Sequence, residues 1–118
     1  MQPTCPQGCA PQCKSDRNIK RDITPVDDRA VLETLATIPV STWAYNADPK
    51  TRHMGPMAQD FHGAFGLGNS DKSYDPIDAH GVAFASIQGL YEIVQEQNAR
   101  IERLEKQNQE LLDRCSRP

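Results

Sequence analysis

A heptad pattern over the last third of the chain constrains its fold more than any other feature. From Ile87 onward, apolar or special residues recur in alternating steps of three and four. The a positions are Ile87, Val94, Ile101, Asn108 and Cys115, and the d positions are Leu90, Gln97, Leu104 and Leu111. About four such heptads are typical of a coiled coil. Residues 81–114 are therefore predicted to form one long helix, with a coiled coil from about residue 87.

Two polar positions in this seam, Gln97 and Asn108, would fix the register of a coiled coil and lower its stability. Arg100 at a g position and Glu105 at the following e position could pair between helices. The alternative is a single amphipathic helix lying on the body, but residues 95–114 are too polar all round for a small core to hold. The heptads do not determine the number of helices, because a buried Asn at an a position also suits dimers.

The residues before this helix predict a compact, irregular body at 15–80. The chain has 118 residues, nine prolines, seven glycines and 37% apolar residues, so its core is modest and association is expected to add stability. The segment TPVDDRAVLETLATIPV predicts a short helix with Thr24 or Asp27 as its cap, Pro25 at an early position and Pro39 at its end.

A β-hairpin and a second short helix are expected to follow. VSTWAYN (40–46) and RHMGPMA (52–58) predict two strands, with ADPKT (47–51) as the turn between them. AQDFHGAFGLG predicts a short helix that Gly66 or Gly68 closes, and the polar residues from 69 to 81 predict a loop. The expected fold class is α+β, a small body with short helices and a hairpin followed by the long helix.

Three cysteines, Cys5, Cys9 and Cys13, lie in the first 14 residues, which are predicted to be a flexible Cys/Pro-rich leader or the remnant of an upstream segment. Their spacing offers three thiolates to a metal ion, but the interspersed prolines oppose a helix and no nearby His completes a familiar zinc pattern. Neither a metal nor a cofactor is expected. The formal charge of −3 gives no electrostatic case for nucleic acid, and no apolar run approaches the ~18 residues of a membrane span.

The segment KSDRNIKRDI (14–23) places Lys20 five residues after Ser15. A serine hydroxyl needs a base within hydrogen-bond reach to act as a nucleophile, and a lysine serves as that base only when it is neutral. Five residues is a poor spacing on one helix face, so a bend at Arg17–Asn18 would have to bring the two side chains together. Spacing alone does not distinguish such a dyad from a solvated surface pair.

The histidines and a group of acidic residues are further candidates. His53 is expected to be a structural hydrogen-bonding residue or part of a site. Asp75, Asp78 and His80 would either contribute to a metal site or cap a helix, and the spacing favours a loop followed by a cap.

Four stretches in order resemble one known family. They are SDRNIKRDI (15–23), LATIPVSTWAYN (35–46), RHMGPMAQDF (52–61) and IDAHGVAFASIQGLYEIVQE (77–96), the last leading into the heptads. Together they resemble the C-terminal intramolecular chaperone of phage tailspikes and endosialidases. This is a serine–lysine self-cleaving peptidase domain, and a related domain occurs in myelin regulatory factor. The resemblance covers roughly residues 15–110.

The resemblance implies a homotrimer that holds an upstream fibre polypeptide while it folds and then cuts itself off at the Lys14–Ser15 bond. Ser15 would be the nucleophile and Lys20 the general base, with His53, Gln59 and Asp60 as possible supporting residues. Assembly would take place in the cytoplasm of a bacterial host, and the domain would be released from the mature virion protein.

Two alternatives stay open. One is a non-catalytic trimerisation module of the same fold, in which Ser15 and Lys20 are retained without cutting. The other is a plain coiled-coil adaptor with a small zinc-binding leader.

Overall fold

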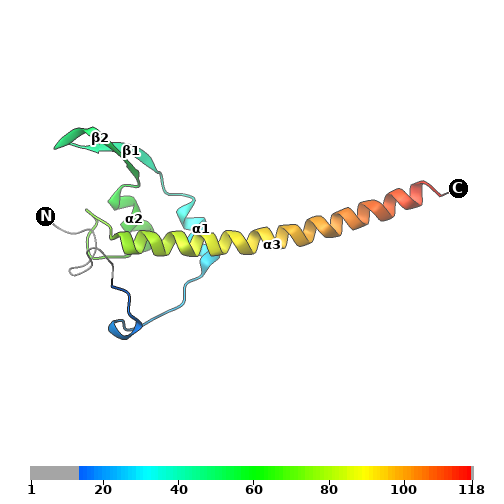
Figure 1. Cartoon of the computed structure of the whole chain (residues 1–118), viewed down its shortest axis with the longest axis horizontal. Helices are drawn as coiled ribbons and strands as arrows, with labels where there is room; N and C mark the ends of the chain where they lie inside the picture. The colour runs from blue at the N-terminus through cyan, green and yellow to red at the C-terminus, as the bar shows by residue number, and fades with distance from the viewer. Residues whose placement is uncertain (1–13, 118) are drawn as a thin grey trace.

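The computed structural model describes residues 14–117, and it is strongly elongated. It measures 79 × 41 × 26 Å with a radius of gyration of 21.9 Å. A compact domain of this length would have a radius of gyration of about 13–14 Å. One long helix accounts for the difference, with the smaller elements gathered around its first half (Figure 1). The predicted fold class, a small α+β body followed by a long helix, is confirmed.

The first α-helix, α1, spans Asp28–Leu35. Of the two predicted caps, Asp27 is the one used: its carboxylate accepts from the backbone N–H groups of Arg29 and Ala30. Pro25 therefore precedes the cap, and its expected place early in the helix is wrong. The helix ends before Pro39, as predicted.

A two-stranded antiparallel hairpin follows, with β1 at Ser41–Tyr45 and β2 at Asp48–Gly55. The prediction that residues 47–51 form the turn was wrong, because β2 already begins at Asp48. A tight turn at Asn46 and Ala47 suffices to reverse the chain, since Asn favours such turns. In Figure 1 the hairpin projects away from the long helix.

The second helix, α2, spans Ala58–Phe65 and ends at Gly66 in the left-handed conformation, with φ 64°. Gly66 is thus the residue that closes the helix, and it can adopt this φ because it has no Cβ. Phe61 is buried between Phe65 and Tyr74, with ring centroids 5.2 and 5.0 Å away.

The long helix, α3, spans Pro76–Cys115, about 60 Å at 1.5 Å per residue. The prediction placed its start at residue 81, five residues late. Asp75 caps the helix by accepting from the Ile77 N–H at 3.3 Å, and Pro76 occupies the first turn. Asp before Pro is a strong start signal that the polar composition of residues 69–81 concealed.

The core of the body lies where α1 and α2 meet the first half of α3. Its fully buried apolar side chains are Phe61, Val82 and Ala85. At Gly89, α1 approaches so closely that a Cβ would lie 2.9 Å from the carbonyl oxygen of Asp28. Small residues on this face of α3 are what allow α1 to dock.

Two ion pairs of Arg29 also link α1 to α3. Its guanidinium pairs with Glu92, at 3.3 Å, and with Glu96, one helical turn further along α3. The hydrogen bond to Glu96 raises the pKa of Arg29. Contact with the carboxyl group of Asp28 raises the pKa of Glu92, while Arg29 acts in the opposite direction. These charged groups are partly exposed, so the two ion pairs orient α1 more than they stabilise the fold.

The heptad seam of α3 faces away from the body. The buried residues of α3, which packs against α1, occupy c, f and g positions: Val82, Ala85, Ser86 and Gly89. The apolar a and d residues are all exposed: Ile87, Leu90, Val94, Ile101, Leu104 and Leu111. The seam therefore does not lie on the body of its own chain, as the amphipathic-helix alternative required. The coiled coil remains a prediction.

Among residues 14–117, no helix is both long enough and apolar enough to cross a membrane.

Two glycines of α3 give a matched test of the α1 contact. Gly89→Ala should destabilise it because the added Cβ meets the backbone of Asp28. Gly81→Ala adds the same methyl group where no atom lies within 4 Å, so only the helix-propensity gain of up to about 1 kcal/mol should appear. We expect Gly89→Ala to be less stable than Gly81→Ala by about 1–3 kcal/mol in urea unfolding. Equal stabilities would contradict the close approach.

Candidate functional site

Ser15 and Lys20 lie side by side in the structure. The Nζ atom of Lys20 lies 2.6 Å from Oγ of Ser15, within hydrogen-bond distance. The bend that this pairing requires is a 3-10 helix, η1, at Arg17–Ile19. Because η1 reverses the chain between them, two side chains five residues apart can meet.

Local hydrogen bonds hold this turn. The carboxylate of Asp16 accepts from the Asn18 N–H at 3.0 Å, and the Lys20 N–H donates to the Arg17 carbonyl oxygen at 3.3 Å. Asp16 was not among the predicted site residues. An Asp side chain that accepts from the backbone N–H two residues later is a known turn signal, and the sequence could have suggested it. It is the residue that positions the pair.

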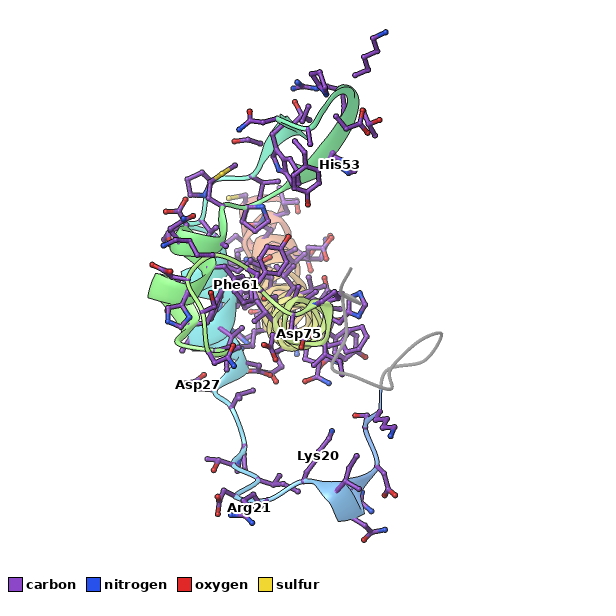
Figure 2. All side chains as sticks on the ribbon, turned by 90° about the vertical axis from the view of Figure 1, so that its left-hand side faces the viewer. Lys20, Arg21, Asp27, His53, Phe61 and Asp75 are labelled. Atoms are coloured by element: carbon purple, nitrogen blue, oxygen red, sulfur yellow. The ribbon has the colours of Figure 1, made fainter. Side chains whose placement is uncertain are left out.

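The pair is fully open to water. Every residue from Lys14 to Asp27 is exposed, and Figure 2 shows Lys20 and Arg21 on a loop that stands away from α3. In this arrangement the Lys20 Nζ atom donates and the Ser15 hydroxyl oxygen accepts. General-base chemistry needs the reverse, with the hydroxyl donating to a neutral amine.

The three supporting candidates lie elsewhere in the chain. His53 is in β2, stacked on Trp43 with ring centroids 5.1 Å apart and edge-on to Tyr45 at 5.2 Å. Figure 2 places His53 and Lys20 on opposite sides of α3. Gln59 and Asp60 are exposed in the first turn of α2. One chain does not bring any of the three to Ser15.

The acidic group at the start of α3 serves the helix. Asp75 is its cap, as the favoured interpretation held. Partial burial, together with the nearby charge of Asp75, raises the pKa of Asp78. His80 stacks on Phe84 with centroids 6.4 Å apart.

Within residues 14–117, no cluster of three or more side chains is suited to hold a metal ion. Cys115 is a free, exposed thiol. Cys5, Cys9 and Cys13 lie outside the described residues, so the zinc-leader hypothesis is untested.

Residues 15–66 match the family model described as "Chaperone of endosialidase", whose name also marks it as a peptidase. Over this segment the chain is similar to the chaperone-of-endosialidase family. The match to this family begins at Ser15 and includes Lys20 and the hairpin, whereas α3 lies beyond it. The family description supports a chaperone role for the chain. No curated protein was found to match it.

Asp78 gives a test of the charges at the start of α3. A carboxyl group whose pKa is raised on folding binds its proton more tightly in the folded state, so its ionisation opposes folding. That penalty is present at pH 7 and disappears as the pH falls through the folded-state pKa and below the unfolded value. The stability of Asp78→Asn relative to the wild type should therefore be higher at pH 7 than at pH 3.

The measurement is urea unfolding of both proteins across this pH range. Glu102→Gln, which neutralises an exposed carboxylate on the same helix, controls for net charge. A relative stability of Asp78→Asn that does not change with pH would contradict the assignment.

Proposed function

We propose that the chain is a self-processing chaperone module. It forms a trimer through α3, assists the folding of an upstream fibre or tailspike polypeptide in a bacterial host, and then releases itself by cutting the Lys14–Ser15 bond. The observation that carries the proposal is the 2.6 Å contact between Ser15 and Lys20 at the start of the family match.

The reaction would proceed by attack of Ser15 Oγ on the carbonyl carbon of Lys14, while Lys20 Nζ accepts the hydroxyl proton. Collapse of the tetrahedral intermediate breaks the C–N bond, and Lys20 returns the proton to the departing Ser15 amine. The resulting ester joins the Lys14 carbonyl to Ser15 Oγ. Water then hydrolyses it, leaving a carboxylate on Lys14 and a chain that begins at Ser15.

Proximity favours this route. Nucleophile and target carbonyl belong to adjacent residues, so no second molecule has to be bound and oriented before the attack. The turn at η1 adds the base at hydrogen-bond distance. Oxyanion stabilisation would come from backbone N–H groups or from His53 of another copy, since His53 of the same chain lies across α3.

Assembly supplies what the isolated chain lacks. An exposed apolar seam of this length is unusual for a monomer and indicates an interaction surface. If neighbouring copies exclude water from around Lys20, the neutral amine becomes easier to form. Cutting would then follow assembly, as a folding aid requires, because premature release would separate the chaperone from its client.

A non-catalytic trimerisation module is the second candidate. The full exposure of Lys20 favours it, because an ammonium that donates to a hydroxyl is an ordinary surface contact.

Intact mass decides between the two. We expect the chain, fused behind an N-terminal carrier, to release a fragment that begins at Ser15. Ser15→Ala removes the nucleophile and Lys20→Arg keeps the charge but cannot supply a neutral base, so both should abolish release. Lys72→Ala, which removes an exposed lysine elsewhere, should cut normally. An assembled wild type that stays intact would leave only the trimerisation module.

Asp16 should act as a positioning residue. Asp16→Ala removes the side-chain bond that holds η1, typically worth about 1 kcal/mol, so release should slow roughly fivefold to tenfold. Asp16→Asn keeps an acceptor and should cut at nearly the wild-type rate. Equal rates for the two variants would show that the cap does not set the geometry of the pair.

A further inference from the structure

Within residues 14–117, no other helix or strand contacts η1, the 3-10 helix between Ser15 and Lys20. Residues 14–26 are hydrogen-bonded within the segment, while Asp27 caps α1. Three aliphatic side chains of this segment, Ile19, Ile23 and Val26, are exposed. Exposed aliphatic side chains on a segment of defined conformation are typical of an interaction surface.

A matching surface lies beside the heptad seam. Phe84 and Tyr91 both occupy e positions, two helical turns apart, and are 65% and 64% exposed. In a parallel coiled coil the a and d residues are covered by neighbouring helices, while e positions flank the seam. Forming the coiled coil therefore leaves these two aromatic side chains available. We define Phe84 and Tyr91 as the aromatic flank.

Helix geometry indicates which copy would reach the flank. The e side of one helix lies next to the g side of its neighbour. In this chain the g and c positions Ser86 and Gly89 are buried under the body, into which residues 14–27 lead. The aromatic flank of one copy thus faces the body of the neighbouring copy, on the side where residues 14–27 of that neighbour lie.

The charges of the two surfaces are complementary. Residues 14–21 contain four basic side chains and one acidic one. From Pro76 to Ala99, α3 carries Asp78, Glu92 and Glu96 and no Lys or Arg, with Asp75 as its cap. Arg29 offsets only part of this negative charge. The basic segment is therefore attracted to the same half of α3 that carries the flank.

We propose that residues 14–27 of one copy dock on the aromatic flank of a second copy, so that the Ser15–Lys20 site is completed between chains. This rests on the proposed function and adds which copy completes the site. Docking removes water from around Lys20 and ties each cut to the presence of a neighbour.

Complementation between two differently tagged chains tests it. One chain carries Phe84→Ser and Tyr91→Ser with an intact Ser15, and the other carries Ser15→Ala with an intact flank. Each alone should release its carrier at least tenfold more slowly than the wild type. Co-expressed, the flank variant should regain release, because the Ser15→Ala copy supplies the missing surface.

Leu112→Ser is the matched control. Leu112 also occupies an e position and is 62% exposed, but it lies roughly 32 Å further along α3 than Tyr91. It should cut as the wild type does. A flank variant that cuts normally by itself, or one that forms trimers with the Ser15→Ala chain and is not rescued, overturns the proposal.

A cross-link gives a readout that does not need cleavage. In chains with Cys5, Cys9, Cys13 and Cys115 changed to Ser, Ile23→Cys on one tagged chain should form a disulfide with Tyr91→Cys on the other. If the wild type does not cut but this cross-link forms, the proposed peptidase function fails and the docking stands. Absence of the cross-link between tags overturns the docking, whatever the cleavage result.

Discussion

The α3 helix has two apolar faces, and one chain covers only one of them. Its buried c, f and g positions lie on the face that packs against α1, and Gly89 leaves the room for this close packing. Its a and d positions face solvent along most of its length. In our proposal, other copies of the chain bind the uncovered face.

The Ser15–Lys20 pair is likewise exposed to solvent. Local hydrogen bonds hold the turn between the two residues, but residues 14–27 are exposed and His53, Gln59 and Asp60 lie elsewhere in the described part of the chain. The two side chains are therefore in contact but exposed to water. In our proposals, the association that covers the seam also supplies the environment that the dyad lacks.

Much of the fold could be predicted because its signals are local. The heptads predict the long helix, Asp27 is one of two predicted caps of α1, and Gly66 is one of two predicted ends of α2. Pairing Ser15 with Lys20 required a bend at Arg17–Asn18, and η1 lies there. The errors came where local signals compete, as at Asp75–Pro76, where a strong cap was hidden by polar neighbours. The exposure of residues 14–27 could not be predicted, because it depends on tertiary packing and has no local sequence signal.

The central claim is that α3 joins three copies through its exposed seam. Sedimentation equilibrium of the Ser15→Ala chain, which cannot process itself, measures this directly. The account predicts a particle of three 13.2 kDa chains at micromolar concentration. A monomer at that concentration would contradict it, since the seam and the aromatic flank would then have no partner copy.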